Sequence, residues 1–118
     1  MNMNQYKKQV DETVIESMIS FMTEWDDCDY TMEDIESCKN ILYTYLDHLA
    51  AMDNPTDDEI MKQVEITVLS LNDLNEKTDY ALIETEEREA IWEVIQESAI
   101  ARGLKEYEDD ITEEWREW

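Results

Sequence analysis

The chain has 118 residues, of which 32 are acidic and nine are basic, so its formal net charge is −23. That length suits one domain, and 42% hydrophobic residues, with four Trp and six Tyr, argue against a disordered chain. Because so many carboxylates repel DNA, RNA and anionic lipid, we expect no direct binding to nucleic acid or membrane and favour a basic protein as partner.

Glycine and proline each occur only once in the chain. Hairpins and βαβ loops need these residues at close intervals, whereas long helices joined by short polar links do not. The composition therefore predicts a single all-α domain over residues 1–118, built as a four- or five-helix bundle.

The first two helices are expected over about residues 4–25 and 32–52, where apolar side chains recur at three- and four-residue spacing. Thr31, followed by Asp34, approximates a capping box that opens the second helix. The stripe of the first helix is Tyr6, Val10, Val14, Met18, Phe21, Met22 and Trp25. The stripe of the second is Ile35, Cys38, Leu42, Tyr45, Leu46 and Leu49.

The third and fourth helices are expected over about residues 57–74 and 86–102. Pro55 ends the preceding helix, and Thr56 with Glu59 forms a full capping box. Residues 75–84 are expected to form a loop with at most a short helical turn, after which Thr85 starts the fourth helix. Gly103 stands where the end of that helix needs a left-handed residue.

A short final helix is expected over residues 105–118, with its apolar side chains again three and four residues apart. This spacing places Trp115 and Trp118 on one face with Tyr107 and Ile111. If the helix is undocked, that face suits protein binding, because Trp and Tyr are frequent at interface hot spots. The alternative is that the helix packs across the bundle, as terminal amphipathic helices usually do.

Acidic residues gather in two clusters that we interpret as candidate partner-binding surfaces. The first cluster is Glu24, Asp26, Asp27, Asp29, Glu33 and Glu36. The second is Glu84, Glu86, Glu87 and Glu89. Carboxylates on a rigid helical surface can imitate nucleic-acid phosphates and occupy a basic groove on another protein. The plainer interpretation is a solvated helix surface, which charged runs on helices usually are.

The preferred function is therefore that of a non-enzymatic acidic binding protein that inhibits or neutralises a basic protein. A toxin-neutralising immunity protein, whose target could be a nuclease, and a nucleic-acid mimic that blocks a DNA-binding protein both fit this description. The alternatives are an enzyme and a structural interaction module that uses the C-terminal aromatic face.

Metal and catalytic motifs find little support in the sequence, so we expect no cofactor and no metal site. Asp27, Asp29 and Thr31 begin like a calcium-binding loop, but Met32 and Cys38 stand where that loop needs Gly and Glu. The single histidine, His48, cannot supply the Glu-x-x-His pairs of a dinuclear site and is expected at a helix surface or boundary.

One enzyme class has a partial match in the acidic pairs of the chain. All-α, magnesium-dependent nucleotide pyrophosphohydrolases hold their metal with Glu-x-x-Glu and Glu-x-x-Asp pairs on helices. Glu33 with Glu36, and Glu76 with Asp79, have these spacings. Such pairs arise by chance in a chain so rich in acids, and the second lies in the least helical stretch.

Two cysteines, Cys28 and Cys38, suit free thiols in a reducing compartment better than a disulfide framework. The N-terminal residues lack the apolar run of a signal peptide, and no apolar stretch reaches the ~20 residues of a membrane helix. We therefore expect a cytoplasmic protein, whose oligomeric state the sequence leaves open.

Overall fold

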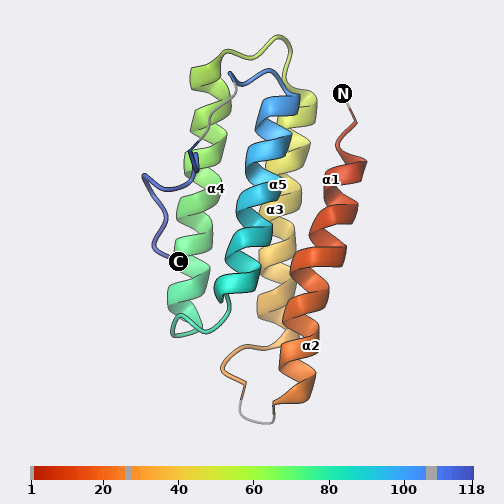
Figure 1. The fold of residues 1–118 in the computed structure, drawn as a ribbon, viewed down its shortest axis with the longest axis vertical. Helices are drawn as coiled ribbons and strands as arrows, with labels where there is room; N and C mark the ends of the chain where they lie inside the picture. The colour runs from red at the N-terminus through yellow and green to blue at the C-terminus, as the bar shows by residue number, and fades with distance from the viewer. Residues whose placement is uncertain (1, 26–27, 106–108) are drawn as a thin grey trace.

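The computed structural model describes residues 2–25, 28–105 and 109–118 and forms an antiparallel bundle (Figure 1). One continuous rod consists of α1 (Asn4–Gln9), the π-helix η1 (Val10–Ile15) and α2 (Glu16–Glu24). It is followed by α3 (Met32–Ala51), α4 (Asp57–Lys77) and α5 (Thr85–Ala101). Within the described ranges no strand occurs, so the predicted all-α fold is confirmed.

The π-helix η1 lies in the part of the first rod where core side chains stand four residues apart. Val10, Val14 and Met18 are four residues apart, and all three are fully buried. In an α-helix, residues four apart drift by about 40° around the axis. The wider turns of a π-helix, closed by i→i+5 hydrogen bonds, reduce this drift. Ile60, Val64 and Val68 have the same spacing in α4 and are fully buried without a π-segment, so this spacing accommodates η1 but does not require it.

Capping boxes open α3 and α4 at the residues predicted from the sequence. Thr31 Oγ1 accepts a hydrogen bond from the backbone N–H of Asp34, and the Asp34 carboxylate accepts the backbone N–H of Thr31. Thr56 and Glu59 make the same reciprocal pair at the start of α4. Such caps are typically worth about 1 kcal/mol each. Because they fix the helix starts locally, they were predictable; the end of α4 lies at Lys77, beyond the expected residue 74.

The core lies along the bundle axis, and a buried tyrosine joins two of its helices. Tyr45 of α3 is almost fully buried, and its hydroxyl donates a hydrogen bond of 2.8 Å to the carbonyl oxygen of Ile95 in α5. Arg102, just after α5, donates from Nε and Nη2 to the carbonyl oxygens of Leu49 and Met52 at the end of α3. These bonds satisfy carbonyl groups that a helix end leaves without intrahelical partners.

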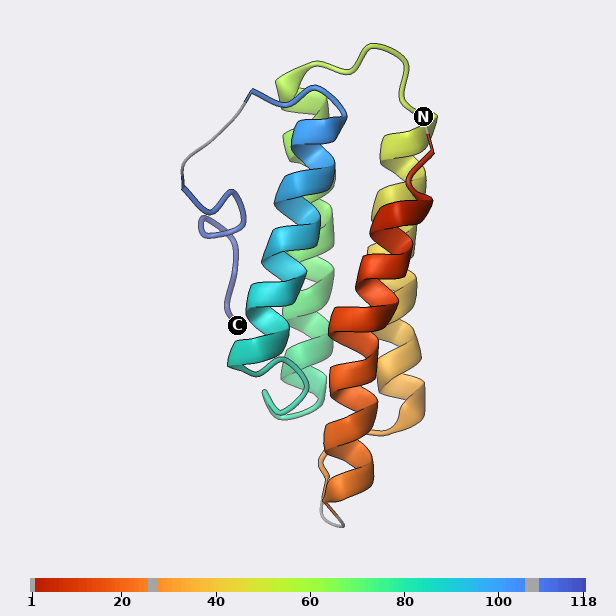
Figure 2. The same ribbon diagram turned by 45° about the vertical axis from the view of Figure 1, so that its right-hand side comes forward.

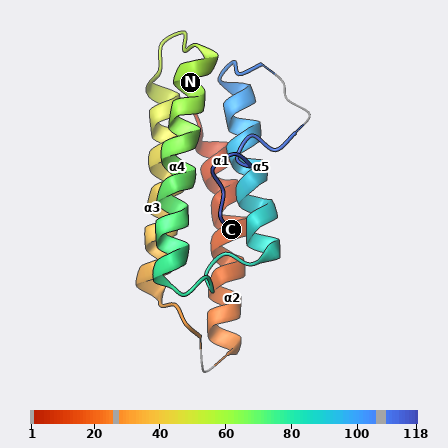
Figure 3. The same ribbon diagram turned by 90° about the vertical axis from the view of Figure 1, so that its left-hand side faces the viewer.

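The expected final helix over residues 105–118 is wrong: in residues 109–118 the chain forms turns between residues 111 and 115, not a helix. This C-terminal segment lies alongside α4 and α5 (Figure 3). Asn72 of α4 donates to the carbonyl oxygen of Trp115 at 2.7 Å and accepts the backbone N–H of Glu117 at 3.0 Å. The backbone N–H of Ile111 donates to Oε1 of Gln96. These side chains take the peptide groups that a helix would have paired internally.

The segment nevertheless docks on the bundle, as the second interpretation of its apolar residues expected. Trp115 and Trp118 are half-buried and pack against the core, and Ile111 is buried. Tyr107, assigned to the same face, lies outside the described residues. Among the helices described, none is both long and apolar enough to cross a membrane.

Candidate functional site

The C-terminal end of α2, the N-terminal end of α3, the C-terminal end of α4 and the N-terminal end of α5 lie at the same end of the bundle (Figures 1 and 2). We name this region the acidic end, because most of its exposed charged side chains are carboxylates. The exposed acids here are Glu24, Asp29, Glu33, Glu36, Glu76, Asp79, Glu84 and Glu86. Both predicted acidic clusters therefore contribute to one region, although Asp26 and Asp27 lie outside the described residues.

A groove at the acidic end brings Glu24 of the first cluster together with residues of the second, while Asp29, Glu33 and Glu36 do not line it. One wall is the last turns of α2, with Phe21 and Glu24, and the other is the start of α5, with Glu84 and Glu86. The groove encloses about 610 Å³, and Ser17, Ser20, Thr85 and Glu87 complete its lining. Sequence spacing alone could not show this, because α3 and α4 separate the two walls along the chain. We call it the acidic groove.

Glu87 is a correction to the predicted partner-facing residues, because its side chain is buried at only 7% exposure. Its Oε2 accepts a hydrogen bond of 2.5 Å from the hydroxyl of Ser17, and its Oε1 accepts the backbone N–H of Glu84 at 3.2 Å. The carboxylate thus caps the first turn of α5 and ties α5 to the rod. Glu87 supports the groove from within, while Glu84 and Glu86 face solvent.

Two aromatic side chains of the predicted apolar stripe of the first helix are exposed at this end. Phe21 is 39% exposed and Trp25 is 60% exposed, with ring centroids 6.1 Å apart. The reason is that α2 extends past the end of the bundle, where no helix covers its apolar face (Figure 1). Phe21 also stacks on the buried ring of Tyr30 at 6.0 Å and 19°. Tyr30 is held in turn by a hydrogen bond to the carbonyl oxygen of Met18.

Burial raises the pKa of two groups at this end, and hydrogen bonds lower the pKa of a third. Burial, reinforced by the negative charge of Glu87, raises the pKa of the Cys38 thiol to about 12. Burial also raises the pKa of Tyr30, and nearby Cys28 and Glu87 add to the shift. For Asp34, burial acts to raise the pKa, but hydrogen bonds from Thr31 and Lys77 prevail and lower it.

Glu89 and the C-terminal tryptophans lie apart from the acidic groove. Glu89 is exposed and lines a small hollow of about 190 Å³ with Arg88, Trp92, Asp110 and Arg116. Arg116 pairs with Asp110 at 3.1 Å, so this hollow carries charges of both signs. The structure does not unite Glu89 with Glu84 and Glu86 in one groove.

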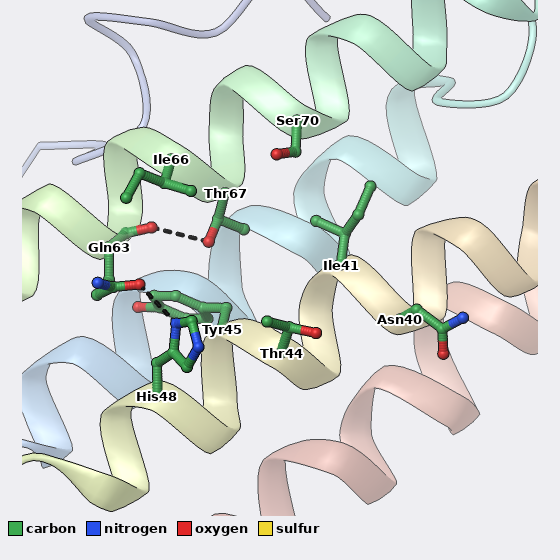
Figure 4. A pocket seen from close by; sticks show the side chains of 9 residues that line it. All are labelled: Asn40, Ile41, Thr44, Tyr45, His48, Gln63, Ile66, Thr67 and Ser70. Atoms are coloured by element: carbon green, nitrogen blue, oxygen red, sulfur yellow. Dashed lines mark hydrogen bonds between the residues drawn. The ribbon is translucent and has the colours of Figure 1, made fainter.

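A second hollow, between α3 and α4, is lined without any acidic or basic side chain apart from His48 (Figure 4). His48 Nδ1 lies 2.9 Å from Oε1 of Gln63, and Thr67 Oγ1 donates to the carbonyl oxygen of Gln63 at 2.8 Å. His48 is exposed, as expected from its place beside the apolar stripe. Hydroxyls of Thr44, Thr67 and Ser70 line this hollow, but the hydrogen bonds of His48 and Thr67 go to Gln63, and no carboxylate lines the hollow to orient the imidazole.

The acidic pairs of the enzyme alternative do not share a helical context. Glu33 and Glu36 lie on α3, but Asp79 lies beyond the end of α4, with a left-handed backbone at φ 57°. Across residues 2–25, 28–105 and 109–118, no three His, Cys, Asp or Glu side chains converge in a way that could hold a metal ion.

Comparison of the chain with models of known protein families, with characterised proteins and with solved structures found no match. The fold places it among small all-α bundles, and its function must be inferred from the groove and the charges around it.

Proposed function

We propose that the chain is an acidic binding protein that inhibits or neutralises a basic protein by engaging it through the acidic end. The observation that carries this proposal is the acidic groove, where Glu24 of α2 faces the same space as Glu84 and Glu86 of α5. An immunity protein directed against a toxin and a mimic of nucleic acid would both use such a surface.

Charge and aromatic surface have separate roles in this proposal. A net charge of −23 steers a positively charged partner towards the protein and speeds the encounter. Long-range attraction gives little residual affinity by itself, whereas aromatic side chains at an interface often give much of it. Phe21 and Trp25 are exposed beside the carboxylates and can supply that contact.

The C-terminal aromatic face is a weaker candidate for partner binding. Trp115 and Trp118 already pack against the core, and Asn72 holds the backbone of their segment. A partner would have to displace these contacts before it could use both rings. The exposed rings at the acidic end carry no such cost.

A charge-matched pair of variants tests the proposal. The groove variant carries Glu24→Gln, Glu84→Gln and Glu86→Gln, and the control carries Asp53→Asn, Glu93→Gln and Glu97→Gln, all of them exposed residues outside the groove. Both lose three negative charges, so the general attraction for basic proteins falls equally. Tagged wild type and the control should capture the same basic protein from cells of the native host, released by salt, and the groove variant should not. Equal capture by all three proteins would refute a role for the groove.

A further inference from the structure

We propose that the acidic groove recognises arginine in preference to lysine on a segment of its basic partner. The guanidinium group would lie against the ring of Phe21 while the carboxylates of Glu24 and Glu84 accept its N–H groups. This inference rests on the proposed function, because it names the chemistry by which the same groove reads a cationic partner.

The groove offers a ring and carboxylates on the same lining. Phe21 and Glu24 are three residues apart on α2, so their side chains lie on one face of the helix. Glu84 and Glu86 lie on the opposite wall. Trp25, whose ring lies 6.1 Å from that of Phe21, enlarges the aromatic surface at the rim. A side chain that enters between the walls meets an aromatic side chain and carboxylates together.

A cation held by both a ring and a carboxylate occurs elsewhere among the described residues, twice with lysine and once with arginine. Lys7 and Lys39 lie 5.0 and 5.2 Å from the ring centre of Tyr43 and pair with Asp47 and Asp11. Arg116 lies 3.1 Å from a carboxylate oxygen of Asp110, and its guanidinium carbon is 5.5 Å from the ring centre of Trp118. Among the described residues, no Lys or Arg lies over the rings of Phe21 or Trp25. The acidic groove offers a ring and carboxylates of the same kinds, and none of the described basic side chains occupies it. The choice between arginine and lysine therefore depends on the chemistry of the two side chains.

Arginine fits this arrangement better than lysine for three physical reasons. Its planar group stacks on an aromatic face, it donates two parallel N–H bonds to one carboxylate, and it gives up hydration more readily than an ammonium group. Lysine, a compact and strongly hydrated point charge, would gain mainly the general attraction that the whole protein provides.

Binding of two peptides at low salt tests this preference. Both peptides have nine residues and blocked ends. In one, serine alternates with arginine, and in the other, serine alternates with lysine. Fluorescence anisotropy should show the arginine peptide binding roughly three- to fivefold more tightly to the wild type. Phe21→Leu and Trp25→Leu should reduce this ratio towards one and leave the lysine peptide nearly unaffected, while Glu24→Gln should weaken both peptides.

A control variant and the pattern of failure separate the two proposals. Tyr80 is an exposed aromatic residue, at 57% exposure, that does not line the groove. Its backbone is left-handed, a conformation that Asn tolerates. The Tyr80→Asn variant should therefore keep the wild-type ratio of arginine-peptide to lysine-peptide affinity. Circular dichroism verifies that each variant is folded. Equal, tight binding of both peptides, or an arginine preference that survives both ring variants, would overturn the inference and leave the proposed function standing. Failure of both peptides to bind would overturn the proposed function as well.

Discussion

Replacing Asn72 with Ala should loosen the C-terminal segment, because this one side chain holds it by two hydrogen bonds. Asn72 is 6% exposed, and its amide donates to the carbonyl oxygen of Trp115 at 2.7 Å and accepts the N–H of Glu117 at 3.0 Å. At about 1 kcal/mol for each bond, the substitution should lower the free energy of unfolding by about 2 kcal/mol. For a chain of this length the melting temperature should fall by roughly 6–8 °C.

The assay for this prediction combines global and local measurements. Urea unfolding gives the free energy. Trp115 and Trp118 contribute to the tryptophan fluorescence together with Trp25 and Trp92, and the emission should shift to the red as these two rings become more exposed. Asn40→Ala, on an exposed position of α3, is the control and should change the free energy by less than about 0.5 kcal/mol. If the Asn72→Ala variant has the melting temperature and the tryptophan emission maximum of the wild type, the two hydrogen bonds do not hold the segment and the reasoning is refuted.

Three further predictions follow from charge and from buried polar groups. Screening should weaken repulsion among the carboxylates, so the melting temperature should rise between about 20 and 200 mM salt; a flat or falling profile would contradict this. Tyr45→Phe removes the hydroxyl bonded to the carbonyl oxygen of Ile95 and should cost about 1–2 kcal/mol by urea unfolding, whereas an unchanged midpoint would show that the bond contributes little. The folded state lowers the pKa of Asp34 below 3.8, so this carboxylate stabilises the protein above the unfolded-state pKa and loses that effect as pH falls through the folded-state pKa. The stability gap between wild type and Asp34→Asn should therefore be full at pH about 7 and shrink below pH about 4, and a gap independent of pH would contradict the assignment.

Most of the helical framework could be predicted because its signals are local. The capping boxes at Thr31 and Thr56 involve residues three apart, and the stripe of α3 needs only the helical period. The π-helix was missed because the four-residue steps from Val10 to Met18 do not distinguish it: the same steps from Ile60 to Val68 lie in an α-helix. Sequence patterns thus locate the helices well, since each pattern acts within a single element.

The C-terminal segment could not be predicted because its partners come from other elements. Its spacing is helical, but Asn72 and Gln96 offer hydrogen bonds that only the assembled bundle provides. The exposure of Phe21 and Trp25 was missed for a related reason, since a stripe shows which face is apolar and not where the covering helices end.

The acidic groove could be predicted only in part. The sequence identified Glu24, Glu84 and Glu86 as surface carboxylates but not that they share a groove. It also placed Glu87 on the surface, although this residue stands three positions after Glu84, the cap of α5, where a carboxylate can turn back to the backbone. With the start of α5 known, its inward role follows from local geometry.

The hydrogen bond between Ser17 and Glu87 joins the two walls of the groove beneath its exposed carboxylates. This bond helps to set the spacing of those walls, so the freedom that the protein loses on association is mainly that of exposed side chains such as Glu24, Glu84 and Glu86. Whatever ordering recognition requires then falls mainly on the incoming chain. A rigid host of this kind can accept a flexible arginine-bearing segment without reshaping itself.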